Sequence, residues 1–230
     1  MDKKRNLAIV PARSGSKGVK DKNIRLLSQK PLMAYTIEAE VKSQIFECIH
    51  VSTDSTKYAE IAQKYGAEVP FLRNEELASD TASTWDMVRF VLAEYKQRGK
   101  IFDCVTVLQP TSPLRTLYDI QNAYKLFCQK QAKAVISVCE TEHSPLWCNT
   151  LSEDGNMNHF LPENATAPRQ ALNKYYRLNG AIYMVDVNIL QEHGELYGEK
   201  TFAYIMEQKH SIDIDEELDF IIAEALLRKC

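Results

Sequence analysis

Short apolar runs alternate along the chain with longer stretches in which apolar residues recur at helical spacing. The short runs are rich in Val and Ile and predict strands at residues 7–10, 49–52, 104–108, 134–138 and 180–185, with 69–72 as a weaker candidate. The longer stretches predict helices at residues 31–41, 84–95, 116–127 and 216–228, and another that ends near residue 61 after a Thr53-Asp54-Ser55 cap. This alternation is typical of an α/β protein in which helices cover a mostly parallel sheet.

The alternation fails between residues 139 and 175. This stretch contains an Asp154-Gly155 turn and three prolines, Pro145, Pro162 and Pro168. Its apolar residues look exposed, and they include Trp147, Leu151, Phe160 and Leu161. We interpret 139–175 as an excursion from a main domain made of residues 1–138 and 176–230. Because its apolar area is large for a monomer, we expect a homodimer.

Length and composition fit this organisation. The chain has 230 residues, 45% of them hydrophobic, which is enough for one large domain. No run approaches the roughly 18 apolar residues of a membrane helix, and the N-terminus leads directly into a predicted strand. Six scattered cysteines without a C-x-x-C pair fit a reducing compartment. We therefore predict a cytoplasmic protein.

The formal charge of -3 conceals an uneven distribution. Residues 1–30 carry nine Lys or Arg against two Asp, a net of +7, whereas residues 211–230 carry six acids against two bases. A nucleic-acid partner requires a broad basic face with aromatic residues, and the basic residues here are confined mainly to one loop. The charges therefore argue for two local sites of opposite sign.

The basic loop follows the first predicted strand. Residues 11–18 read PARSGSKG, and Lys20, Lys22, Asn23 and Arg25 come next. A glycine-containing loop at the carboxyl end of a strand exposes backbone N–H groups and long cations, which suits a phosphate chain. A solvated basic turn is the alternative. The loop matches neither the Walker pattern nor G-x-G-x-x-G.

Polar groups also follow other predicted elements. Residues 108–115 (LQPTSPLR) display polar side chains between two prolines at the end of the most apolar strand, as expected for substrate-positioning groups. A stiff turn that only caps the next helix is the alternative. Residues 77–84 (LASDTAST) are rich in hydroxyls, and helix capping is the simpler explanation for them. Arg169 and Arg177 could bind a carboxylate or a phosphate, or form ordinary surface ion pairs.

Two carboxylates alternate near the C-terminus. If residues 211–215 are extended, Asp213 and Asp215 point to the same face while Ile212 and Ile214 turn into the core. Such a pair can share one hard cation. An acidic helix N-terminus is the alternative, and it suits Glu216 better than the Asp pair.

Seven segments, in this order, resemble the CMP-sialic acid synthetases, also called N-acylneuraminate cytidylyltransferases. They are PARSGSKGVKDKNI, the STD of residues 52–54, ELASDTAS, LQPTSPLR, PRQ, YRLNGAIY and SIDIDEELD, and together they cover nearly the whole chain. The resemblance implies a three-layer Rossmann-like nucleotidyltransferase fold with a small dimerisation excursion. It also implies that CTP and N-acylneuraminate react, with Mg²⁺, to give CMP-N-acylneuraminate and pyrophosphate.

The resemblance assigns roles to individual residues. The triphosphate would be bound by Arg13, Ser16, Lys17 and Lys22. The cytidine would lie against Asn23, Arg73, Ala82, Ser83 and Thr84. The sugar would face Gln109, Thr111, Ser112, Arg169 and Tyr183, with Arg177 near its carboxylate or the phosphates. Asp213 and Asp215 would bind magnesium, and the groups expected to act in catalysis are Arg13, Lys17 and Asp215.

The substrate is less closely defined than the reaction. Thr84 stands where the family often has Ser, and Leu196 and Tyr197 stand where sialic acid members can carry an aromatic pair. Legionaminic, pseudaminic and 3-deoxy-manno-octulosonic acids therefore remain alternatives. A non-catalytic nucleotide-binding protein is a further alternative, and the intact Asp pair and Arg13 count against it. No His occupies an obvious general-base position, so we expect metal activation of the sugar 2-hydroxyl for in-line attack.

Overall fold

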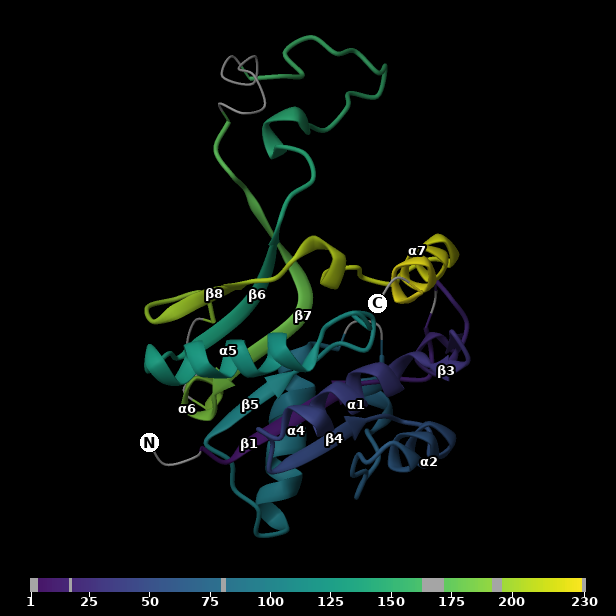
Figure 1. Ribbon diagram of the computed structural model, residues 1–230, viewed down its shortest axis with the longest axis vertical. Helices are drawn as coiled ribbons and strands as arrows, with labels where there is room; N and C mark the ends of the chain where they lie inside the picture. Colours follow the sequence, from purple (N-terminus) through teal and green to yellow (C-terminus); the bar gives the residue numbers. More distant parts are fainter. Residues whose placement is uncertain (1–3, 17, 80–81, 163–171, 192–195, 229–230) are drawn as a thin grey trace.

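The computed structural model describes residues 4–16, 18–79, 82–162, 172–191 and 196–228. A six-stranded sheet with the order β4-β1-β5-β7-β6-β8 forms its centre (Figure 1). The strands are β1 Asn6–Pro11, β4 Cys48–Ser52, β5 Cys104–Val107, β6 Ala134–Glu140, β7 Tyr176–Asp186 and β8 Thr201–Ile205, with a small hairpin of β2 Leu26–Leu27 and β3 Lys30–Pro31. The α-helices are α1 Leu32–Ser43, α2 Thr56–Lys64, α3 Glu75–Ala78, α4 Thr84–Gln97, α5 Leu117–Gln129, α6 Val187–Gln191 and α7 Glu217–Leu227.

The sheet is mostly parallel. Strand β1 pairs in parallel with both β4 and β5, and β8 is parallel to β6. Strand β7 is antiparallel to its neighbours β5 and β6. The carboxyl ends of β4, β1 and β5 therefore meet at one edge of the sheet, the usual position of a ligand site in an open α/β fold.

Alternation along β1 shows how the layers form. Leu7 and Ile9 are buried against α4, whereas Ala8 lies in a cluster with α5 and Val10 packs against α1 and α2. Side chains of a strand point to opposite faces in turn, so one strand contributes to both cores. Helices cover both faces, and the predicted three-layer α/β architecture is confirmed.

Most predicted elements are present, with shifted ends. The strand predicted at residues 69–72 is wrong: these residues form no strand, and the preceding Glu68 makes only an isolated bridge with His50. Pro70 has no N–H to donate to a ladder, which disfavours a strand there. Strand β8, the hairpin and helices α3 and α6 were not predicted. Each is five residues or shorter, and none has the fully buried apolar run that marked the equally short β5.

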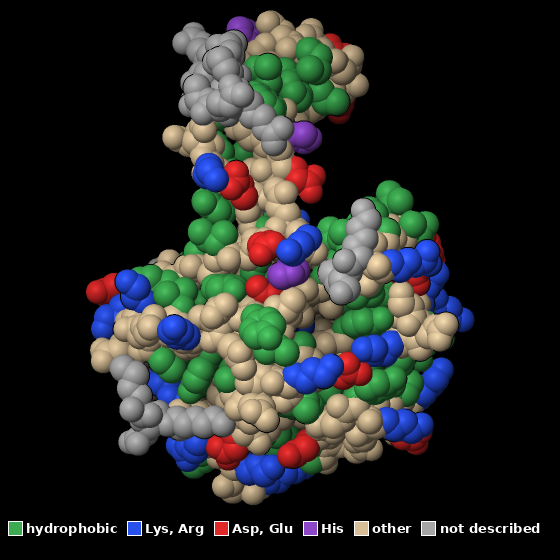
Figure 2. All heavy atoms as spheres, viewed as in Figure 1, with side chains coloured by type: hydrophobic (Ala, Val, Ile, Leu, Met, Phe, Trp, Pro, Cys, Tyr) green, Lys and Arg blue, Asp and Glu red, His purple; other side chains and the backbone are tan. Residues whose placement is uncertain are grey.

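The segment that links β6 to β7 projects from the body of the protein as an arm (Figure 1). We use "arm" for its described residues, 141–162 and 172–175. Figure 2 shows hydrophobic side chains gathered at its tip. Among the residues of the arm, Leu151 is 63% exposed and Met157 is 57% exposed. The arm falls within the predicted excursion at residues 139–175, whose first two residues still belong to β6. No helix in the described part of the chain has the length and apolar character needed to cross a membrane.

Candidate active site

A cavity of about 440 Å³ opens at the carboxyl edge of β1 and β5. It is lined by residues from the basic loop, the segment before α4, the turn after β5 and the acidic segment before α7. The predicted site residues on its wall are Arg13, Ser16, Lys22, Asn23, Arg73, Ala82, Ser83, Thr84, Gln109, Thr111, Asp213 and Asp215. The fold therefore brings together most of the residues that the sequence singled out.

Three predicted residues lie outside this wall. Ser112 is fully buried, and its hydroxyl has no hydrogen-bond partner. Arg177 is exposed and donates from Nη2 to the main-chain oxygen of Ser211 at 3.3 Å. Tyr183 is partly buried with its ring edge-on to Trp85, and burial raises its pKa. Lys17 and Arg169 lie outside the described residues.

The basic loop is fixed by a carboxylate from the neighbouring strand. The main-chain N–H of Ser14 donates to Asp54 Oδ1 at 2.8 Å, and the Ser14 hydroxyl donates to Asp54 Oδ2 at 2.6 Å. Burial acts to raise the pKa of Asp54, but these hydrogen bonds hold it below its ordinary value. Asn23 Nδ2 donates to the main-chain oxygen of Arg13 at 3.0 Å. These hydrogen bonds fix the backbone that carries the cationic side chains of the loop.

Arg73 crosses from the end of β4 to the segment before α4. Its Nη2 donates to the main-chain oxygen of Ser52 at 2.8 Å, and its Nη1 donates to that of Leu77 at 3.3 Å. Burial lowers the pKa of its guanidinium to about 10, so the group stays charged at neutral pH. Arg73 therefore adds positive charge to the same wall and holds its two parts together.

The acidic segment lies against the basic loop. Lys22 Nζ donates to Asp215 Oδ1 at 2.9 Å and to the main-chain oxygen of Ile214 at 2.8 Å. The N–H of Ile214 donates to the main-chain oxygen of Thr111 at 2.8 Å, so the segment is also tied to the turn after β5. Ile214 is fully buried, as predicted, which directs the flanking Asp213 and Asp215 to the cavity.

Glycine permits this close approach. A Cβ on Gly18 would lie 2.8 Å from the main-chain oxygen of Asp215, a distance that real Cβ atoms essentially never show. Any other residue would force the two segments apart. The sequence showed the glycine but not its reason, because the contact joins opposite ends of the chain.

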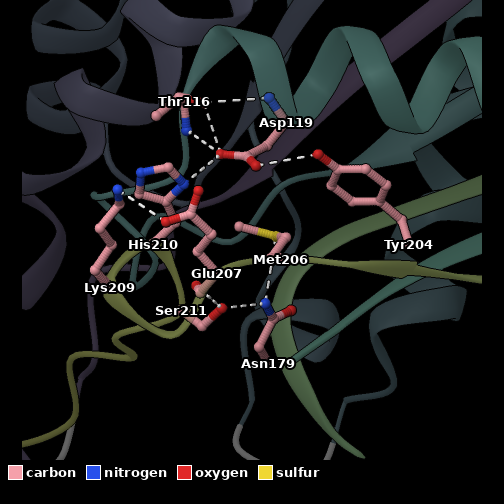
Figure 3. A network of polar contacts seen from close by, with 9 residues as sticks. All are labelled: Thr116, Asp119, Asn179, Tyr204, Met206, Glu207, Lys209, His210 and Ser211. Carbon is pink, nitrogen blue, oxygen red and sulfur yellow. Dashed lines mark hydrogen bonds and ion pairs between the residues drawn. The ribbon is translucent and has the colours of Figure 1, made fainter. Parts of the chain in front are cut away.

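A polar network holds the chain just before the two aspartates (Figure 3). His210 Nδ1 lies 3.2 Å from Asp119 Oδ2, and Tyr204 donates to the other oxygen of Asp119 at 3.2 Å. Asn179 Nδ2 donates to Ser211 Oγ at 2.9 Å. Residues 204–211 are thereby joined to the start of α5 and to β7, which fixes where the acidic segment begins.

Asp213 and Asp215 have the features of a small hard-cation site. Burial raises the pKa of Asp213, a hydrogen bond from Thr111 opposes this, and the nearby charge of Asp215 adds to it. Asp213 Oδ1 is buried without a hydrogen-bond partner. Among the described residues no group of three or more His, Cys, Asp or Glu could hold a metal ion by itself. Two carboxylates fit Mg²⁺ when phosphate oxygens and water complete its shell.

Other lining residues were not predicted. They are Pro11, Gly18, Leu77, Ser79, Met87 and Pro110. Met87 is one helical turn from Thr84 and so faces the same way, a signal that the sequence did contain. The predicted Thr53-Asp54-Ser55 cap is confirmed, with Ser55 as the residue whose side chain caps α2. Asp54 of the same triplet has the further contact with Ser14, which was not predicted.

Comparison with known proteins gives consistent results. A family model described as cytidylyltransferase matches residues 7–229. The chain is 39% identical to CMP-N,N'-diacetyllegionaminic acid synthase of Legionella pneumophila, over 97% of its own length and 96% of that protein. It is 36% identical to N-acylneuraminate cytidylyltransferase of Escherichia coli O18:K1:H7, over 97% of its own length and 52% of that protein, which is about twice as long.

A solved structure is similar in fold. CMP:2-keto-3-deoxy-manno-octonic acid synthetase, complexed with CTP, superimposes with a TM-score of 0.73 and 15% sequence identity. The match covers 98% of this chain and 99% of that chain. At this identity the likeness concerns the fold alone, and it confirms the predicted Rossmann-like nucleotidyltransferase architecture.

Proposed function

Because the chain belongs to the cytidylyltransferase family, we propose that it transfers the cytidylyl group of CTP to a nonulosonic acid and releases pyrophosphate. The observation that carries this proposal is the shared cavity wall: Lys22 of the basic loop contacts Asp215 of the acidic segment there. A nucleoside triphosphate with a divalent cation needs both signs of charge at one place.

In the proposed reaction the sugar 2-hydroxyl attacks the α-phosphorus in line while pyrophosphate leaves. Arg13, Ser16 and Lys22 bind the triphosphate, and Lys17 has the same role by family resemblance. Asn23, Arg73 and residues 82–84 bind the cytidine. The positive charges stabilise the negative charge that develops on the leaving group, and loss of one such contact costs about 3 kcal/mol in the transition state.

The sugar lies on the other side of the cavity in this proposal, against Gln109 and Thr111. Ser112, Arg169, Arg177 and Tyr183 were assigned to the sugar by resemblance, and they remain part of the proposal. Rigid positioning of the hydroxyl relative to the phosphorus supplies a large share of the rate.

Asp213 and Asp215 would hold Mg²⁺. When bound, the cation would polarise the α-phosphate and lower the pKa of the attacking hydroxyl. The unpartnered oxygen of Asp213 supports this assignment. Removal of divalent cations with EDTA should abolish pyrophosphate release, and added Mg²⁺ should restore it.

N-acylneuraminate is the sugar that the motifs favoured, and the E. coli relative is named for it. The Legionella relative is named for a diacetylated legionaminic acid, so it supports legionaminic acid as the substrate equally well. The discriminating experiment is pyrophosphate release from CTP with Mg²⁺ and a panel of N-acylneuraminic, legionaminic, pseudaminic and 3-deoxy-manno-octulosonic acids. Turnover of one of these sugars supports the proposal. If the protein binds CTP but releases pyrophosphate with none of these sugars, a non-catalytic role is favoured.

We also propose that the arm joins two copies of the chain into a homodimer. Its exposed apolar residues, Leu151, Met157 and Leu161, support this. Light scattering of the purified protein at micromolar concentration tests the proposal directly.

A further inference from the structure

Arg115, at the end of the turn that follows β5, has no role in the function proposed above. It is 3% exposed, an unusual position for a residue that is always charged. Burial of a guanidinium is costly unless its donors find acceptors, so its partners indicate what it holds in place.

The guanidinium joins three elements. Its Nη1 donates to the main-chain oxygens of Ala181 in β7 and of Gln109 after β5, at 2.7 and 3.2 Å. Its Nη2 donates to the Thr36 hydroxyl in α1 at 2.7 Å. The planar fork of arginine can hold several acceptors in fixed directions, which the single ammonium of lysine does not reproduce.

Asp119 and, when ionised, Glu40 favour the charge of Arg115. Burial raises the pKa of Glu40 to about 8, with the charge of Arg115 opposing this, so Glu40 is mostly protonated at neutral pH. Glu40 lies four residues after Thr36 on α1, so both side chains face the same way, and Glu40 is fully buried. Burial lowers the pKa of Arg115 to about 10, while the charges of Glu40 and Asp119 act to raise it. The guanidinium therefore stays protonated at neutral pH.

The acceptors of Arg115 lead directly to the cavity. Gln109 lines it, and the Gln109 side chain lies so close to Gly180 that a Cβ there would be 2.5 Å from Gln109 Oε1. Thr111 also lines the cavity, and its main-chain oxygen accepts from Ile214, the residue between Asp213 and Asp215. Displacement of residues 109–111 would thus move polar groups on one side of the cavity.

We propose that Arg115 is a positioning residue for the acid-sugar side of the site, where it fixes the main chain of residues 109–111 and, through it, Gln109 and Thr111. The inference rests on the function proposed above. The nucleotide side is held by separate contacts, such as those of Arg73 with Ser52 and of Ser14 with Asp54. Loss of the Arg115 fork should therefore affect the sugar more than CTP.

The test compares Arg115→Lys with Arg89→Lys. Arg89 is a matched control, because it also donates to a main-chain oxygen, that of Leu190 at 3.2 Å, but does not line the cavity. For each variant, pyrophosphate release is measured once with varied sugar at saturating CTP and once with varied CTP at saturating sugar. Hydrogen exchange is measured at the amides of Gln109, Thr111 and Ser112, because Pro110 and Pro113 have no N–H. Arg115→Lys should lower kcat/KM for the sugar about 10- to 100-fold and speed exchange there. The KM for CTP should stay within about twofold, and Arg89→Lys should change neither quantity.

Thr36→Val is a second, milder variant in case Arg115→Lys does not fold. It removes the Thr36 hydroxyl, which accepts from Arg115 Nη2 and itself donates to the main-chain oxygen of Gln109 at 3.5 Å. The charge of Arg115 is kept, so the variant should produce a smaller change of the same kind. Exchange that matches the wild type at Gln109, Thr111 and Ser112 in the folded variants would overturn the inference. Equal losses for CTP and sugar would also overturn it, since they indicate a general structural role. A wild-type protein inert toward every acid sugar would instead contradict the proposed function, and hydrogen exchange would still decide whether Arg115 holds the turn.

Discussion

Lys22 Nζ donates to Asp215 Oδ1 at 2.9 Å and joins two segments that are 193 residues apart in sequence. Lys22 belongs to the N-terminal stretch with a net charge of +7, and Asp215 belongs to the acidic C-terminal stretch. The Asp215 side chain is 74% exposed, so the contact contributes little to stability. Its importance is positional, because it places opposite charges on one wall of the cavity.

Replacement of Asp215 by Asn should abolish most activity without unfolding the protein. The side chain is exposed, so the free energy of unfolding should change by less than about 1 kcal/mol. Turnover should fall by about two orders of magnitude or more, because a carboxylate that would hold Mg²⁺ is lost. Steady-state pyrophosphate release at saturating Mg²⁺ measures this, with Glu60→Gln on the exposed side of α2 as control. Near-normal turnover would show that Asp215 is not a metal ligand.

Gly18→Ala should weaken the site by separating the basic loop from the acidic segment. The new Cβ would meet the main-chain oxygen of Asp215 at 2.8 Å, and neither backbone can yield without moving the wall. We expect a loss of about tenfold or more in kcat/KM for CTP. Gly15→Ala in the same loop is the control, because its nearest neighbour, Arg13 Nη1, would be 4.0 Å away. Equal activity of the two variants would contradict this account of Gly18.

The sequence predicted the layers and most of the site because both depend on local signals. Apolar runs such as that of β5 mark buried strands, and polar residues directly after them must lie at the sheet edge. The side chains of Gln109 and Thr111 were predicted in this way, and the structure has them on the cavity wall.

Contacts between distant segments left no such signal. Arg115 is buried against Thr36, and Gly18 lies close to Asp215. Both contacts depend on which loops and helices the folded sheet brings together, and hydrophobic periodicity carries no information about that. Strand β8 is a similar case. It is five residues long at the edge of the sheet, with partly exposed side chains that weaken the alternation.

His50 should make the protein less stable as the pH falls below about 6.5. It is fully buried beside Phe71 and Tyr95, and burial lowers its pKa from 6.5 to about 3. The unfolded chain binds a proton near pH 6.5 and the folded protein does not, so this stabilisation is complete above pH 6.5 and is lost as the pH falls toward 3. The expected slope from this residue is about 1.4 kcal/mol per pH unit.

Denaturant unfolding between pH 7 and pH 4 measures this slope, with His50→Phe as the comparison. The Phe variant keeps an aromatic ring beside Phe71 and Tyr95, loses the hydrogen bond between His50 Nδ1 and the Tyr95 hydroxyl, and cannot titrate. Its free energy of unfolding should fall less steeply with decreasing pH than that of the wild type. Parallel curves for the two proteins would show that His50 is protonated in the folded state as readily as in the unfolded chain.

Leu151→Lys in the arm should convert the proposed homodimer to a monomer. Leu151 lies in the arm and is 63% exposed, and Figure 2 shows hydrophobic side chains gathered at the arm tip. A charge introduced into an apolar interface must lose its hydration without finding a partner, which costs several kcal/mol when two copies associate. Leu218→Lys is a matched control, because Leu218 is 62% exposed but lies on α7 in the body of the protein. Light scattering across a concentration series should give a dimer for the wild type and for Leu218→Lys, and a monomer for Leu151→Lys. Dissociation caused by Leu218→Lys alone would place the interface on α7 instead of the arm.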